Sequence, residues 1–190
     1  MSKAVLISIR PKWVEKIANG EKTIEVRKTK PKMETPFKCY IYCTLPKYPH
    51  EDFIATDYPR PQFYGGGKVI GEFTCDRIYK IDKDSTDFLF KAGGLSVYKQ
   101  AAEEKCGLCV AMTDDELHGY LGHCQGYGWH ISDLLIYDQL RELSEFQRAT
   151  DPCDSCHAEY TWECTGCKKF GSNIKRPPQS WCYVEAMKDE

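Results

Sequence analysis

The feature that most restricts the fold is a pattern of strand, helix, turn and strand near the start of the chain. The apolar, β-branched run KAVLISI predicts a first strand over residues 3–9. Pro11 then fits the first turn of a short helix, and Asn19 with Gly20 fits the C-terminal end of that helix. Apolar and polar residues alternate over residues 23–27, which is the period of a strand. The pattern therefore predicts a second strand that begins shortly after the helix.

The second predicted strand has an apolar side and a polar side. Because side chains alternate across a strand, Ile24 and Val26 are expected to face the core. Glu25 and Arg27 share the opposite side, and Lys22 occupies the turn before them. The polar side admits two interpretations. It is either the solvated side of an edge strand or the floor of a binding site.

The rest of the chain predicts a mostly β domain. Further strands are expected over residues 37–45, 68–81, 126–137 and 176–186, and helices over residues 96–105 and 113–121. The second of these helices opens with Thr113 and Glu116, at the spacing of a capping box. The 190 residues fit one domain, so we expect a single α+β unit over residues 1–190, built as a small β-barrel with flanking helices.

The distribution of charge favours an anionic partner. The formal net charge is -2, but residues 1–50 contain 11 Lys and Arg against 4 Asp and Glu. The basic part includes the run RKTKPK at residues 27–32. Nucleic acid is the commonest partner of such a region. The alternative is a lysine-rich surface that is only solvated.

The stretch GEKTIEVR, residues 20–27, fits the G-x-K-x-x-E-x-R signature of the ASCH domain, a branch of the PUA-like superfamily. The segments GYGWHISDL, ELSEF and RPPQSWCYVE also resemble ASCH-type proteins of bacteriophages and Gram-positive bacteria. The resemblance covers about residues 1–149 and 173–187. It implies a small β-barrel with flanking helices, a cleft beside the signature strand, and RNA or a nucleoside or nucleotide as ligand.

The motif match makes four residues candidates for the cleft: Gly20, Lys22, Glu25 and Arg27. A lysine supplies a movable cation, and an arginine beside a glutamate places a planar donor group next to an acceptor. Such a set can contact a phosphate and a base edge together.

Two further residues are ligand candidates from their positions. Arg10, at the end of the first strand, suits a phosphate contact, and it also suits a plain surface position. Trp129 lies on a predicted strand and offers a ring for a base to stack on, with a core position as the alternative.

An enzymatic function is the second interpretation. Some ASCH-type proteins resemble amidohydrolases that act on N4-acylated cytidine with a lysine, a threonine and a glutamate. Lys22 matches that lysine, but this chain has Glu25 where the family threonine falls, and Glu103 and Glu104 match the family glutamate only loosely. In an enzyme, Lys22 would be the nucleophile or base and Glu25 the general acid or base. Binding is favoured, because two of the three roles lack a match.

The cysteines indicate a metal. The chain has 11 cysteines and no recognisable leader segment, which favours a reducing cytoplasm (the host's, for a phage protein) over a disulfide framework. Two C-x-x-C pairs fall in an inserted loop over residues 151–171, and they can close a tetrahedral structural zinc site: Cys153, Cys156, Cys164 and Cys167. The alternative is four reduced thiols. A third interpretation of function is a phage or host protein-interaction module that uses this loop.

A further C-x-x-C pair, Cys106 and Cys109, leaves open a second metal site, although packing thiols are the simpler interpretation. No apolar run reaches the roughly 20 residues that a membrane-spanning helix needs, so we expect no membrane partner. The sequence carries no signal for an oligomeric state.

Overall fold

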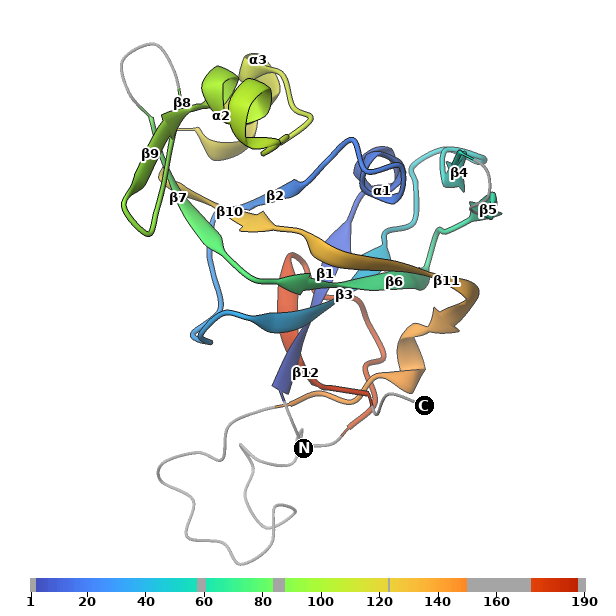
Figure 1. Ribbon diagram of the computed structural model, residues 1–190. Helices are drawn as coiled ribbons and strands as arrows, with labels where there is room; N and C mark the ends of the chain where they lie inside the picture. Colours follow the sequence, from blue (N-terminus) through green and yellow to red (C-terminus); the bar gives the residue numbers. More distant parts are fainter. Residues whose placement is uncertain (1–2, 58–60, 84–87, 123, 150–171, 188–190) are drawn as a thin grey trace, which may run out of the picture.

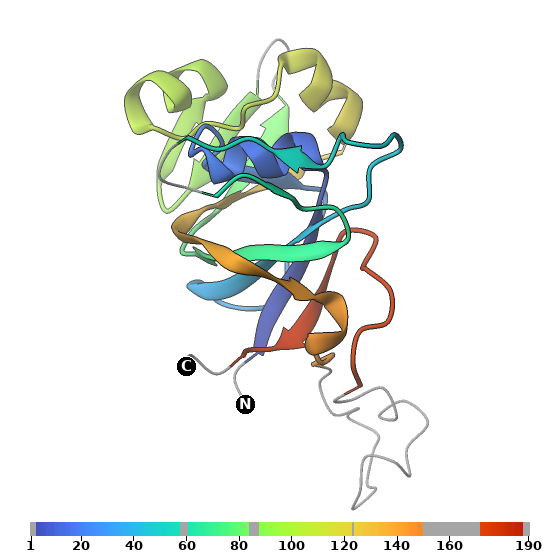
Figure 2. The same ribbon diagram turned by 90° about the vertical axis from the view of Figure 1, so that its right-hand side faces the viewer.

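The computed structural model describes residues 3–57, 61–83, 88–122, 124–149 and 172–187, and all structural statements below refer to these residues. Two five-stranded sheets and three short helices make up the fold (Figures 1 and 2). In spatial order, the first sheet contains β11 (Ser132–Glu142), β6 (Lys68–Cys75), β3 (Phe37–Cys43), β1 (Lys3–Ile9) and β12 (Trp181–Glu185). The second contains β2 (Ile24–Arg27), β10 (Gly126–His130), β7 (Ile78–Lys83), β8 (Phe88–Ala92) and β9 (Leu95–Tyr98).

The helices are α1 (Pro11–Ala18), α2 (Lys99–Cys106) and α3 (Asp114–Leu121), with a 3-10 turn, η1 (Leu143–Glu145). A small ribbon of β4 (Phe53–Ile54) and β5 (Phe63–Tyr64) completes the described elements. Figures 1 and 2 show all three helices at the same end of the molecule, at the top of both views. This end carries the site described below.

The predicted start of the chain is confirmed. β1 and β3 run parallel, and α1 makes the crossover that leads from β1 toward the second sheet. Pro11 occupies the first turn of α1, and Gly20 adopts a φ of 77°, which a residue without a side chain reaches without strain. The capping box between Thr113 and Glu116 at the start of α3 is also present.

The expectation of a barrel is wrong for the described residues, because the two sheets do not close on each other. Two segments predicted as single strands instead change sheets. The segment 68–81 divides into β6 and β7 around Asp76 and Arg77, and the segment 126–137 divides into β10 and β11 at Ile131. There the amide of His130 donates to the Arg77 carbonyl at 2.9 Å, which holds the two crossing points together.

The helix predicted over residues 96–105 begins later in the structure than the sequence indicated. Gly93 and Gly94, both with positive φ, turn the chain into a β8–β9 hairpin, and α2 begins only at Lys99. Apolar side chains fill the space on the two sides of the second sheet. One cluster joins β1, β3 and α1 around Trp129, and another joins β2, β7 and β8 to α2 and α3 around Phe90. Consequently β2 is buried between elements from both halves of the chain.

Candidate functional site

The signature strand β2 forms the edge of its sheet, but its outer edge is covered. On one side it pairs with β10, so that Glu25 lies opposite Trp129. On the other side the amides of Thr23 and Ile24 donate to the carbonyl of Cys109, at 2.9 and 3.0 Å, and the Cys109 amide donates to Thr23 Oγ1 at 2.8 Å. The segment between α2 and α3 therefore closes the edge that the sequence left open.

The three charged residues of the signature are buried. Lys22 is 2% exposed, Glu25 5% and Arg27 8%. The interpretation of this strand as a solvated edge is therefore wrong. Charged groups are almost never buried this deeply unless they are paired or serve a function.

Glu25 links the two cations into one network. Its Oε1 lies 3.0 Å from Arg27 Nη2, and its Oε2 lies 3.5 Å from Lys22 Nζ. Backbone carbonyls satisfy the outer donors: Lys22 Nζ donates to Val110 O at 2.6 Å, and Arg27 Nη2 donates to Ser8 O at 2.7 Å. These contacts fix the three side chains against both β1 and the segment before α3.

The network is incomplete at two atoms. Glu25 Oε2 and Arg27 Nε are buried, and neither has a hydrogen-bond partner among the described residues. Buried polar atoms without a partner are rare in folded proteins because each costs free energy. One is an acceptor and the other a donor, so a ligand that offers a donor and an acceptor would complete the network.

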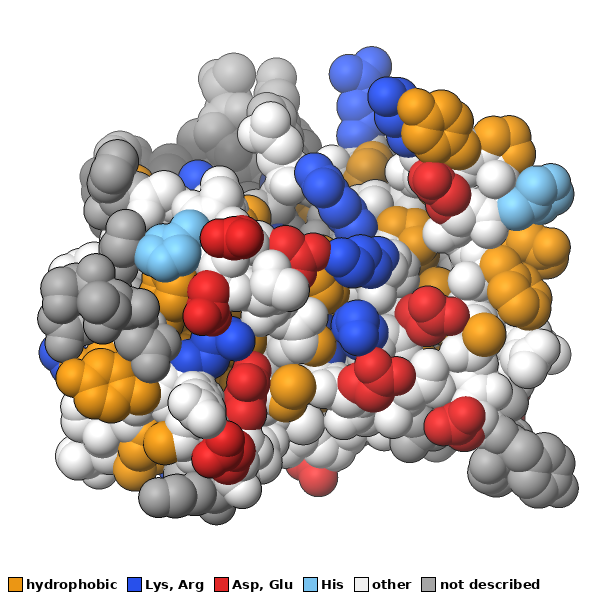
Figure 3. All heavy atoms as spheres, turned by 90° about the horizontal axis from the view of Figure 1, so that it is seen from above, with side chains coloured by type: hydrophobic (Ala, Val, Ile, Leu, Met, Phe, Trp, Pro, Cys, Tyr) orange, Lys and Arg blue, Asp and Glu red, His pale blue; other side chains and the backbone are white. Residues whose placement is uncertain are grey.

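The charged network lines a cavity of about 590 Å³. β1, α1, β2, α3 and the segment before β12 contribute its walls. The lining includes charged, aromatic and hydroxyl side chains: Ser8, Arg10, Trp13, Lys22, Glu25, Arg27, Glu116 and Tyr120. Lys and Arg side chains form a row across this side of the molecule, with acidic side chains on both sides of the row (Figure 3). The volume falls within the range of roughly 300–1,000 Å³ that is usual for ligand sites.

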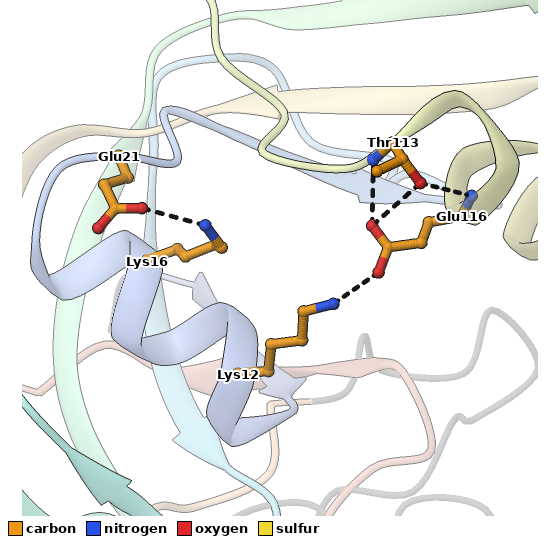
Figure 4. A network of polar contacts seen from close by, with 5 residues as sticks. All are labelled: Lys12, Lys16, Glu21, Thr113 and Glu116. Atoms are coloured by element: carbon orange, nitrogen blue, oxygen red, sulfur yellow. Dashed lines mark hydrogen bonds and ion pairs between the residues drawn. The ribbon is translucent and has the colours of Figure 1, made fainter.

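An ion pair joins the two helices beside the cavity. Lys12 on α1 lies 2.5 Å from Glu116 on α3, and the same carboxylate caps α3 through Thr113 (Figure 4). The Lys12 ammonium lowers the pKa of Glu116, which keeps that carboxylate ionised. The pair fixes the separation of α1 and α3 at the cavity wall.

Burial is the main influence on Lys22. It lowers the pKa of this ammonium below the ordinary value of 10.5, the charge of Glu25 raises it again, and that of Arg27 lowers it. The ammonium also lies 5.3 Å from the centre of the Trp13 ring. The charged form of Lys22 is thus stabilised mainly by Glu25 and by the Val110 carbonyl.

The structure brings most of the predicted ligand residues together. Arg10 is exposed and lines the cavity, and its side chain has no hydrogen bond or ion pair with the described residues. Gly20 lies at the turn and not in the lining. Trp129 is fully buried and lies outside the lining. It is therefore a core residue, and its ring is not accessible to a base.

The aromatic residues of the cavity are Trp13 and Tyr120, which the sequence did not single out as ligand residues. The position of Trp13, three residues after Arg10 and on the first turn of α1, was a signal that it could share a site with Arg10. Glu103 and Glu104, the loose matches to a catalytic glutamate, do not line the cavity. Glu103 pairs with Lys99, and Glu104 accepts from Gln100.

The predicted zinc ligands, Cys153, Cys156, Cys164 and Cys167, and the whole loop 151–171 lie outside the described residues. Within the described part of the chain, no group of three or more His, Cys, Asp or Glu is arranged to hold a metal. Cys39, Cys43 and Cys75 are buried thiols, and burial raises the pKa of Cys43 and of Cys75 to about 12. No described helix is long and apolar enough to cross a membrane.

The overall fold is that of an ASCH domain. The chain is similar to the crystal structure of ASCH from Zymomonas mobilis, at a TM-score of 0.53 and 16% identity over 96% of this chain and 87% of that one. A tyrosine-to-phenylalanine mutant of the same protein gives a TM-score of 0.53 at 16% identity, over 97% of this chain and 91% of that one. A serine-to-alanine mutant gives 0.52 at 15% identity, over 96% and 88%. Neither a protein-family model nor a curated protein matches the sequence.

Proposed function

We propose that this chain is an ASCH-domain protein that binds RNA or a modified nucleotide through the cavity beside β2. The observation that carries the proposal is that two buried atoms in the wall, Glu25 Oε2 and Arg27 Nε, have no hydrogen-bond partner among the described residues. A nucleobase edge presents donors and acceptors side by side, as an amide does, and it can satisfy both atoms at once.

The rest of the cavity supports the same class of ligand. Arg10, whose guanidinium pairs with no described residue, is suited to a phosphate, since its planar donors match phosphate oxygens. Trp13 and Tyr120 supply aromatic surface for a base. A cavity lined by three cationic and two anionic side chains favours a ligand that is itself an anion with a polar, hydrogen-bonding ring.

Replacing Arg27 with alanine should weaken the binding of a nucleoside monophosphate or short RNA by about 1–3 kcal/mol, because a donor to the ligand is lost. Lys22→Ala should act in the same direction. Isothermal titration with the four ribonucleotides and with cytidine derivatives measures both. Lys16→Ala removes one exposed lysine of α1 that pairs with Glu21, and it is the control for general charge loss. The proposal fails if both cavity variants bind every ligand as the parent does.

Hydrolysis of an acylated cytidine is the second candidate function. The lowered pKa of Lys22 favours it, because only an uncharged amine acts as nucleophile or base. The hydrogen bond to Val110 O and the ion pair with Glu25 oppose it, because both stabilise the charged ammonium. Free acid released from N4-acetylcytidine in the same titration mixtures would identify an enzyme.

The four-cysteine zinc site stays a prediction. Purified, freshly reduced protein should contain about one zinc ion per chain, and replacing any one of Cys153, Cys156, Cys164 or Cys167 with serine should remove it. Metal analysis by mass spectrometry measures the content. Cys182→Ser, which changes a half-buried thiol of β12, is the control. A parent protein without zinc would refute the site and, with it, the proposal that a metal-ordered loop contacts a phage or host protein.

A further inference from the structure

The segment directly after β2, residues 28–32, has an unusual charge environment. Lys28, Lys30 and Lys32 are exposed, and none forms an ion pair with a described residue. Among the other lysines whose side chains the structure describes, eight are paired with a carboxylate: Lys12, Lys16, Lys22, Lys38, Lys68, Lys80, Lys91 and Lys99. Three lysines without an ion pair to a described residue therefore lie close together on this connection, which joins β2 in one sheet to β3 in the other (Figure 1).

Each lysine of the segment lies beside a tyrosine. Lys28 Nζ is 5.5 Å from the centre of the Tyr120 ring, and Lys30 Nζ is 5.8 Å from that of Tyr127. The amide of Lys32 donates to the hydroxyl of Tyr183 at 2.7 Å. All three tyrosines are half-buried. Lysines interleaved with aromatic rings are the composition of surfaces that bind single-stranded nucleic acid.

The residues between the lysines anchor the segment. Thr29 Oγ1 accepts from the indole Nε1 of Trp181 at 3.0 Å, and Pro31 is buried. Anchoring residues thus alternate with exposed lysines along one connection. Because the backbone is already fixed, a ligand orders only the side chains when it binds.

The segment is continuous with the cavity. Lys28 follows Arg27 in the chain, and Tyr120 belongs both to the cavity wall and to the first lysine–tyrosine pair. A free nucleoside held in the cavity would leave Lys30 and Lys32 without a role. A strand that continues beyond the cavity would place its phosphates against them.

We infer that Lys28, Lys30 and Lys32, with Tyr127 and Tyr183, form a second binding site that takes the phosphate backbone and flanking bases of a single-stranded nucleic acid. The inference rests on the proposed function, because one nucleotide of the same strand occupies the cavity. When the Lys30 ammonium turns from the Tyr127 ring to a phosphate, that ring face becomes available to a base. The ammonium over the Tyr183 ring is that of Lys3, at 4.9 Å, and it can turn away in the same manner. Paired bases of a duplex offer no such face, so the site selects single strands.

The test compares a single-stranded RNA of roughly nine nucleotides, the same sequence as DNA, its duplex, and the mononucleotide, over a range of salt concentrations. In the triple variant Lys28→Ala/Lys30→Ala/Lys32→Ala, affinity for the single strands should fall at least tenfold at low salt. The slope of log affinity against log salt should fall by about 2, since each phosphate contact contributes roughly 0.7 for a single strand. Affinity for the mononucleotide should stay within about twofold of the parent value.

The matched control is Lys68→Ala/Lys80→Ala/Lys91→Ala, which removes the same charge from paired lysines elsewhere. It should bind the RNA as the parent does. Equal losses in the two triple variants, or a duplex bound more tightly than the single strand, would overturn the inference. If Arg27→Ala leaves mononucleotide binding unchanged while the segment variant still loses the RNA, the cavity proposal fails and the segment stands. If only Arg27→Ala lowers affinity, and affinity does not depend on oligonucleotide length, the inference of a second site on the segment is refuted and the proposal of a ligand in the cavity is retained.

Discussion

Replacing Glu25 with alanine is expected to lower the free energy of unfolding by about 3–5 kcal/mol, because it leaves two buried cations without their counter-ion. Lys22 Nζ would keep only the Val110 carbonyl, and Arg27 Nη2 only the Ser8 carbonyl. Neither carbonyl carries the charge that offsets burial of a cation. Denaturant unfolding, followed by tryptophan fluorescence and by circular dichroism, measures the change.

Glu21→Ala is the matched control for this change. Glu21 is also a glutamate of the signature segment and also pairs with a lysine, but the pair with Lys16 is largely exposed. An exposed pair contributes about 0–1 kcal/mol, so the control should stay close to the parent. Similar small losses in both variants would mean that water reaches the Glu25 network and that its charges are not buried.

Local signals made the start of the chain predictable. β1, α1 and β2 are specified by residues close in sequence: the β-branched run, Pro11, Gly20 and the alternation from Thr23. The signature also placed Lys22, Glu25 and Arg27 at one site. In each case the physical cause acts within a few residues, so it is visible in the sequence.

The features that the sequence did not predict depend on long-range packing. The alternation continues through Ile131, so nothing local marks that change of sheet, whereas two successive polar residues, Asp76 and Arg77, interrupt the alternation where the chain passes from β6 to β7. The burial of Lys22 depends on Val110, which lies 88 positions later in the chain. Tyr120 reaches the cavity only because α3 packs over the second sheet. The sequence allowed Trp129 to be either a base-stacking residue or a core residue. Its ring contacts with Phe37 and Trp181 show that it is a core residue.

A buried charge network can exist for stability or for a ligand, and a variant that removes all three charges separates these roles. Buried ion networks are often replaced by apolar residues of similar volume with little loss, or even a gain, of stability. Lys22→Met/Glu25→Leu/Arg27→Met keeps the side-chain volume and removes every buried charge. We expect its free energy of unfolding to lie within about 1–2 kcal/mol of the parent value, well above that of Glu25→Ala.

The same triple variant should lose most of its affinity for the ligand, because the three buried charged contacts to a base are removed and Arg10 is the cation of the lining that remains for a phosphate. At a roughly 1–3 kcal/mol loss for each contact, the expected weakening exceeds a hundredfold, and titration with the ligand that the parent binds best measures it. A stable variant that still binds that ligand as the parent does would place the ligand elsewhere. A variant as unstable as Glu25→Ala would assign the network a packing role that apolar side chains cannot replace. Stability without binding is the outcome that a ligand-directed network requires, since Glu25 Oε2 and Arg27 Nε are buried without a hydrogen-bond partner among the described residues, which costs free energy in the folded state.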